Sequence, residues 1–370
     1  MAHLCAIFYV EWFSTSGYSR RVFIYGSTLT MKLSTLFFLI AANSSFFAQS
    51  QSIEAEFDRF DKLYQQQLGS TQGCQSPELN VFRVCSAALR NDGNAPFILH
   101  HNKVTSKVVV LFHGLSDSPF YLRSIAKALY QQGNNVVVGL LPGHGKKQAD
   151  VDMQDPNLAD RWRQHFAEVV ELSADLGENL YLGGFSTGGT VATEYLLLHA
   201  NEVKGLMLFS GALALDPKIE WLSKIWGSQR LAKWLDGDYQ TSGDNPFKYP
   251  QVSRSAALEL AEIIFSIREL IEQGKGPNLP LFVAHSVVDK TIPILGVKNL
   301  MKANQSLNVF FEISKEYDVC HADVVINQTQ FTEVEYKPTA LEEVLPCSTP
   351  SINPLHAEML ESLLTFMATN

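Results

Sequence analysis

The chain has 370 residues, which is enough for two or three domains of ~150 residues or for one large α/β domain. Hydrophobic residues make up 46% of the chain and charged residues 18%, and the mean hydropathy is close to zero. This composition excludes a disordered chain and a protein with many membrane spans. The 29 Lys and Arg residues face 38 Asp and Glu, a net charge of -9, which argues against nucleic acid as the main partner.

The first fifty residues look like an export segment. From Met31 the chain has one Lys, an apolar run over 33–42, a polar break and then small residues, the layout of a secretory signal peptide. We expect Met31 to be the true start and cleavage to follow Ser50 or, as the second choice, Ala48. The stretch 19–23, Ser-Arg-Arg-Val-Phe, resembles a twin-arginine signal and is an alternative export route. Either route predicts a periplasmic or secreted protein without a membrane span, since the apolar run is too short.

Four cysteines remain after residues 1–50 are removed, and the net charge becomes -11, with 26 basic and 37 acidic residues. An exported chain with four cysteines predicts two disulfides, for which three connectivities are possible. We favour the two pairings that are local in the sequence, Cys74–Cys85 and Cys320–Cys347. Buried free thiols are the alternative.

From residue 105 onward, predicted strands alternate with predicted helices. The run 107–112, Lys-Val-Val-Val-Leu-Phe, is continuously apolar after its first residue, as in a parallel strand covered on both faces. Alternation of this kind predicts βαβ units, and therefore an α/β fold with a mostly parallel sheet and helices on both faces. The predicted strands are 107–112, 135–140, 179–183, 203–209, 281–284 and 308–313, and the predicted helices are 53–67, 119–132, 161–176, 190–200, 255–273 and 357–367.

About seventy residues between 210 and 281 differ from the rest because they contain no strand pattern. They combine a long helical pattern with many aromatic residues, which predicts a helical insertion at one end of the sheet. These aromatic side chains either line an apolar pocket or bury the insertion against the body of the domain. They are Trp221, Trp226, Trp234, Tyr239, Phe247 and Tyr249.

The strongest local signal is the stretch 183–189, Gly-Gly-Phe-Ser-Thr-Gly-Gly, which contains G-x-S-x-G. It follows an apolar strand and precedes a helix, which is the context that this nucleophile motif requires. A turn this sharp holds Ser186 in strained backbone, with the helix N-terminus behind the negative charge that develops during acyl transfer. The sequence therefore predicts a serine nucleophile.

An acyl-transfer serine also needs two N–H donors for the oxyanion. The backbone N–H of Thr187, directly after the nucleophile, is one candidate. The second is the N–H of Leu115, within His-Gly-Leu-Ser at 113–116, at the end of the first clear core strand. An ordinary strand-end turn is the alternative interpretation of that stretch.

The acid and the base should follow the serine in that order. Asp289 stands just beyond the predicted strand 281–284, while Asp216 is a rival that more plausibly caps a helix of the insertion. His321 follows the strand 308–313 by a short loop, at the sheet edge that carries Ser186. His356, just before the final helix, is the alternative base.

Together these motifs resemble the α/β-hydrolase superfamily, and within it the monoacylglycerol-lipase and carboxylesterase-like branch, also called serine aminopeptidase-like hydrolases. The similarity covers about 105–370 and rests on H-G-L-S-D-S-P-F-Y-L-R, L-P-G-H-G, G-G-F-S-T-G-G, V-V-D-K-T-I-P and C-H-A-D-V. It implies Ser186 as nucleophile, Asp289 as acid, His321 as base, Leu115 and Thr187 as oxyanion donors, and 212–278 as the lid. About 35 residues separate His321 from the last helix, whereas such enzymes usually have few there. Because of this departure from the family pattern, His356 remains the alternative base.

The domain prediction is a leader over 1–50, an N-terminal segment over 51–104 and the hydrolase domain over 105–370. The predicted function is a serine hydrolase that cleaves carboxylic esters, small-molecule or lipid, through an acyl-enzyme. Alternatives are a catalytically silent binding protein of the same fold, or an acyltransferase or amidase. We expect no cofactor and no metal, because no His/Cys/Asp cluster has metal-ligand spacing. The stretch 142–147, Pro-Gly-His-Gly-Lys-Lys, fails the phosphate-loop pattern, and the sequence leaves the oligomeric state open.

Overall fold

A computed structural model describes residues 52–74, 80–216, 220, 228–336, 347 and 349–370. Its centre is a sheet in which nine strands of the described residues pair in the order β1-β2-β3-β5-β4-β6-β7-β8-β9. In this order the strands from β5 to β9, β4 included, run parallel to one another. At the β5 edge the sheet is extended by antiparallel pairing, in which β3 pairs with β5, β2 with β3, and β1 with β2. Their bounds are β1 Thr71–Gly73, β2 Val81–Ser86, β3 Phe97–Leu99, β4 Thr105–Phe112, β5 Asn135–Gly139, β6 Gly177–Phe185, β7 Val203–Phe209, β8 Leu281–Ser286 and β9 Asn308–Ile313.

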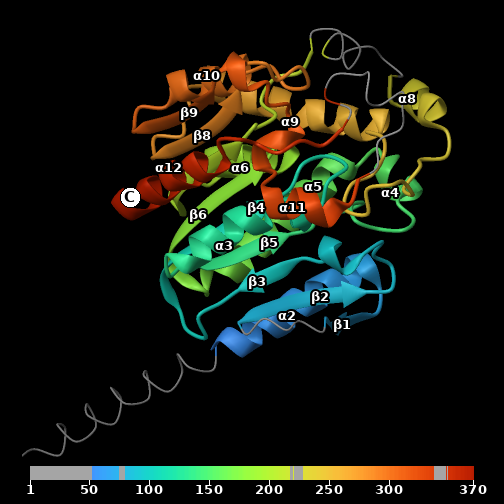
Figure 1. The fold of residues 1–370 in the computed structure, drawn as a ribbon, viewed down its shortest axis with the longest axis horizontal. Helices are drawn as coiled ribbons and strands as arrows, with labels where there is room; N and C mark the ends of the chain where they lie inside the picture. The colour runs from blue at the N-terminus through green and yellow to red at the C-terminus, as the bar shows by residue number, and fades with distance from the viewer. Residues whose placement is uncertain (1–51, 75–79, 217–219, 221–227, 337–346, 348) are drawn as a thin grey trace, which may run out of the picture. The chain divides into compact units, whose positions relative to one another are not determined.

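Helices cover both faces of this sheet, as predicted. One face packs against α2 (Ser52–Leu68), α5 (Leu158–Ala174), α6 (Thr187–Leu198), α9 (Arg254–Glu272) and α10 (Leu295–Ala303). The other packs against α3 (Arg123–Gln131), α11 (Gln328–Val334) and α12 (His356–Thr369), which Figure 1 shows gathered on one side of the sheet.

The continuous apolar run in β4 is explained by the helices that cover both faces of the sheet. Side chains alternate between the faces of a strand, so both sets must be apolar when both faces are buried. Val108, Val110 and Phe112 join the core on the α5 side. Val109 and Leu111 join the core on the α3 side, and all five side chains are fully buried.

The three antiparallel strands lie in a stretch where the sequence predicts only a loop after the first helix. They are short, and β1 reads Thr-Gln-Gly with a mostly exposed pattern, so neither alternation nor a long apolar run marks them. Residues 119–132 also differ from the predicted single helix. A 3₁₀ turn over Pro119–Leu122 comes first, and the α-helix begins at Arg123.

The insertion, residues 212–278, contains α8 (Ser228–Asp236) and α9 in its described part, and no strand there, as predicted. Its aromatic residues mostly anchor it: Phe247 stacks on Phe120 with ring centroids 3.7 Å apart, and Tyr239 packs edge-on against Tyr249. Trp234 is instead 77% exposed. Trp221 and Trp226 lie outside the described residues. A membrane-spanning helix, long and apolar, is absent from the described part of the chain.

Candidate active site

Ser186 occupies the turn between β6 and α6, at the carboxyl end of the parallel strands. Its backbone has φ 51° and ψ -116°, a region that non-glycine residues rarely adopt. Its N–H donates to the carbonyl of Phe209 on the neighbouring strand, 3.0 Å away, which helps to hold this strained turn. The predicted strand–turn–helix context of the motif is confirmed.

The glycines beside Ser186 are required by close packing. A Cβ at Gly184 would lie 2.4 Å from the backbone carbon of Gly188, and one at Gly188 would lie 2.0 Å from the carbonyl oxygen of Phe112. The Gly188 N–H also donates to the carbonyl of His113 at 2.9 Å. The turn thus packs directly on the end of β4.

His321 and Asp289 meet Ser186 in the arrangement that the chain order predicts. His321 Nδ1 lies 2.6 Å from Asp289 Oδ2, and His321 Nε2 lies 2.9 Å from Ser186 Oγ. A carboxylate only accepts hydrogen bonds, so Nδ1 carries the imidazole proton and Nε2 accepts from the serine hydroxyl. This is the contact geometry of a nucleophile, a base and a group that orients the base.

Asp289 is held as an anion although its side chain is completely buried. Burial by itself raises its pKa, but the hydrogen bond from His321 and the neighbouring donors keep the pKa below the usual value. Its other oxygen, Oδ1, accepts the N–H groups of Thr291 and Ile292, both at 2.9 Å. His285, also buried, places Nε2 3.2 Å from the Ile292 carbonyl and 3.4 Å from Asp289 Oδ2.

The two predicted oxyanion donors are Thr187, which directly follows Ser186, and Leu115, which lines the same cavity as Ser186. The N–H groups of Leu115 and Thr187 donate no hydrogen bond to another described residue, so both are available to a ligand. Leu115 belongs to the loop 113–118, hereafter the oxyanion loop. Buried His113 anchors this loop, since its Nε2 accepts the N–H of Leu141 at 3.1 Å and its Nδ1–H donates to the Gly114 carbonyl at 2.8 Å. Burial keeps its pKa well below the usual value, so the ring is neutral.

The alternative base and acid are not part of this contact set. His356 is buried at the start of α12, where its Nε2 lies 3.1 Å from Ser124 Oγ, and burial lowers its pKa to about 4. The backbone carbonyl of Asp216 accepts the N–H of Glu220, at the beginning of the insertion.

A cavity of about 460 Å³ opens over Ser186 and His321. Part of its wall is apolar and comes from the insertion and the loop after β8. That part includes Leu215, Val252, Ala257, Leu260 and Ile292.

Another part of the same cavity is charged, and the sequence reasoning did not identify it. Asp117 is 4% exposed and forms an ion pair with Lys248, with Nζ 2.9 Å from Oδ1. Asp323, two residues after His321, is 3% exposed and also lines the cavity. Asp117 lies inside the quoted motif H-G-L-S-D-S-P, so its position next to the oxyanion donor is the signal that could have revealed it.

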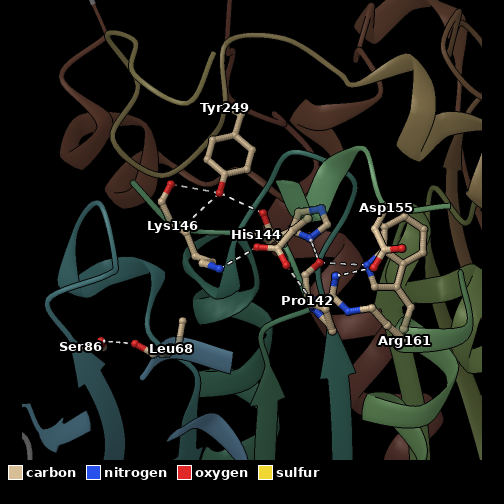
Figure 2. A network of polar contacts seen from close by, with 11 residues as sticks. Leu68, Ser86, Pro142, His144, Lys146, Asp155, Arg161 and Tyr249 are labelled. Atoms are coloured by element: carbon tan, nitrogen blue, oxygen red, sulfur yellow. Dashed lines mark hydrogen bonds and ion pairs between the residues drawn. The ribbon is translucent and has the colours of Figure 1, made fainter. Parts of the chain in front are cut away.

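A polar network lies beside the site and joins the insertion to the loop after β5 (Figure 2). The Tyr249 hydroxyl accepts the N–H of Lys146 at 2.8 Å and lies 3.0 Å from the Gly143 carbonyl. His144 is fully buried there, with its Nδ1 3.1 Å from the Pro142 carbonyl. The Gly-Lys of this stretch therefore packs against the insertion.

Both predicted disulfides are present. Cys74 is bonded to Cys85, and Cys320 is bonded to Cys347. The second bridge ends on the residue before His321, and both of its cysteines line the cavity. No group of three or more potential metal ligands is found among the described residues.

Comparisons with known proteins bear on the family and the fold of this chain. The family described as "Serine aminopeptidase, S33" matches residues 103–317. A thermostable monoacylglycerol lipase of Bacillus sp. (strain H-257) is 25% identical over 204 residues, covering 54% of this chain and 76% of that protein. One of the metagenome-derived lipolytic enzymes LipS and LipT matches with a TM-score of 0.56 and 16% identity, over 75% of this chain and 98% of that one. A monoacylglycerol lipase of Paleococcus ferrophilus matches with a TM-score of 0.50 and 15% identity, over 72% and 96%.

Proposed function

Because the chain belongs to the serine aminopeptidase S33 family of α/β hydrolases, whose match spans more than half of it, we propose that it is a carboxylic ester hydrolase. The family resemblance and the α/β-hydrolase fold predicted from the sequence are confirmed. The reaction and the roles of individual residues are our proposal. The observation that carries it is the unbroken contact series from Asp289 through His321 to Ser186.

In the proposed mechanism, Ser186 attacks the ester carbonyl while His321 Nε2 takes the hydroxyl proton. Asp289 keeps the imidazole in the required tautomer and stabilises the imidazolium. The N–H groups of Leu115 and Thr187 bind the oxyanion, and His321 then protonates the leaving alcohol. Water, activated by the same base, releases the acid from the acyl-enzyme. Base catalysis of this kind contributes ~10²–10⁴-fold and each oxyanion donor ~10²–10³-fold.

The cavity supports an apolar acyl group in the substrate. Its aliphatic side chains, Leu215, Val252 and Leu260 among them, come from the insertion, which we propose to act as a lid over the site. Monoacylglycerol lipases among the similar proteins make a lipid ester a reasonable candidate substrate class. A silent binding protein is disfavoured because none of the three contacting side chains is missing.

Hydrolysis of p-nitrophenyl esters of increasing acyl length tests this function and the choice of base. We expect His321→Ala to lower kcat by at least ~10³-fold, because the serine then has no base, and His356→Ala to keep most of the activity. Retained activity in His321→Ala together with loss in His356→Ala would reverse the assignment. Formation of a hydroxamate in the presence of hydroxylamine, at the expense of free acid, would indicate that the reaction passes through an acyl-enzyme.

We also propose that the protein is exported and that residues 1–50 include its leader. The leader layout from Met31 and the two disulfides support this, since disulfides persist in oxidising compartments.

A further inference from the structure

We infer that Arg90, in the N-terminal part of the chain outside the family match, is a positioning residue for the oxyanion hole. It acts through residues 243–250 of the insertion, hereafter the strap. The inference rests on the proposed function and adds to it a mechanical role for the segment that precedes the hydrolase core.

The Arg90 side chain forms hydrogen bonds with backbone carbonyls of the strap. Its guanidinium donates to the carbonyls of Lys248 at 2.7 Å, Asn245 at 2.9 Å and Gly243 at 3.5 Å. The same group lies over the ring of Tyr249, 5.5 Å from its centroid. A planar fork of five donors suits such a set of carbonyls, and a lysine ammonium could not span them in the same way.

Two residues close to Arg90 in the sequence also contact the strap. Asn94 Nδ2 donates to the carbonyl of Pro246 at 3.0 Å, and a Cβ at Gly93 would collide with the ring of Phe247 at 2.4 Å. Both Gly93 and Asn94 belong to the connection between β2 and β3. The strap therefore packs against the connection between two antiparallel strands at the sheet edge.

The strap also contacts the oxyanion loop. The N–H of Tyr249 donates to the carbonyl of Ser116 at 2.8 Å, and Lys248 pairs with Asp117. Both contacts are made to the two residues that follow Leu115, whose N–H is a proposed oxyanion donor. Ser116 has φ 67°, a left-handed conformation that a serine keeps only when its surroundings impose it. The strap supplies two of those constraints.

Arg90 is suited to a test because it does not line the cavity and so does not touch the substrate. We expect Arg90→Met to lower kcat for a p-nitrophenyl ester by about tenfold with KM within about twofold, because the oxyanion donor is misplaced rather than removed. The thionoester of the same acyl group provides a specific readout, since its sulfur is a poor acceptor for the oxyanion donors. The ratio of kcat/KM for the oxoester over the thionoester should therefore fall in Arg90→Met.

Arg90→Lys keeps the positive charge but loses the planar guanidinium, so it should give a smaller fall in that ratio. If Arg90→Met does not fold, Arg90→Lys tests the positioning role by itself. Arg59→Met is the matched control: Arg59, on α2, pairs with Glu56 and Asp175, so its loss should leave the ratio at the wild-type value. Unchanged ratios in both Arg90 variants, with Ser186 still labelled by a fluorophosphonate, would overturn the inference alone. A folded wild type that reacts with neither ester nor probe would overturn the proposed function with it.

Discussion

Asp323 shows how the burial of a single carboxyl group ties stability to pH. The side chain lines the cavity, is 3% exposed, and accepts the N–H of Ser351 at 2.9 Å. Burial outweighs this donor and the nearby Lys248, and it raises the pKa of Asp323 to about 6. The folded chain therefore binds this proton more tightly than the unfolded chain, in which an Asp titrates near ~4.

The sign of the effect follows from linkage. As the pH rises from about 4 to about 6, the unfolded state has already released the proton, so the ionisation of Asp323 destabilises the fold. Asp323→Asn keeps the oxygen that accepts the Ser351 N–H and removes the titration. We expect it to exceed the wild type in unfolding free energy by roughly 2 kcal/mol at pH 7.5 and by much less at pH 4.

Urea unfolding at the two pH values measures this difference. Asp318→Asn, an exposed carboxylate of the same loop, should follow the wild type throughout. An Asp323→Asn variant whose advantage does not grow with pH would contradict the argument.

Single residues differ in how far the sequence reveals them. Ser186, Asp289 and His321 could be predicted because each follows a strand of a parallel sheet, and the carboxyl ends of such strands share one edge. Lys248 could not be placed opposite Asp117, because it lies in an irregular segment whose path depends on Arg90. His285 precedes Asp289 by four residues, and its contact with the carboxylate depends on the loop geometry after β8.

At the scale of elements, the Cys320–Cys347 bridge joins the loop of His321 to the stretch before α12. Two backbone-related contacts reinforce it, since the Asn353 N–H donates to the Ile326 carbonyl and Asn353 Nδ2 donates to that of Val324. The loop that carries the proposed base is therefore fixed from outside the family match, which ends at residue 317.

Replacing both of these cysteines by serine should lower stability and also kcat, because His321 adjoins the released end. The closed loop spans 27 residues, and the unfolded-state entropy released by losing the bridge lowers stability by about 3.5 kcal/mol. The matched control is the pair Cys74→Ser and Cys85→Ser, whose bridge spans 11 residues and lies outside the cavity lining. It should lower stability comparably, and kcat should stay at the wild-type value. Thermal unfolding and ester kinetics separate the two effects, and equal kcat in both double variants would contradict a positioning role.

The elements themselves were predicted where the physical signal is local. Strands covered on both faces, such as β4 and β7, end in buried apolar runs and were placed within two residues. Helix α6 begins at Thr187, three residues before the prediction, since Gly188, packed on the end of β4, and Gly189, packed near Gly184 and Leu208, are helical despite their low propensity. The short strands β1 to β3 form through pairing with the β5 edge, a long-range cause that no local pattern records.

For the whole molecule, export predicts a processed N-terminus. Expressed with its leader in a secreting bacterial host, the protein should lose residues 1–50, or 1–48, and carry two disulfides. Intact mass before and after reduction and alkylation measures both features at once. A secreted product that still begins at Met1 or Met31, or that alkylates at four cysteines without reduction, would contradict this proposal.

Ser186 is the proposed nucleophile, activated by His321 and Asp289. The most direct measurement is covalent labelling by a fluorophosphonate, read by intact mass and peptide mapping, for the wild type and Ser186→Ala. Both proteins should give the same thermal unfolding midpoint within a few degrees, so that loss of labelling is not loss of fold. We expect one adduct, on Ser186, in the wild type and none in Ser186→Ala. A folded wild type without an adduct, or equal labelling of Ser186→Ala, would contradict it.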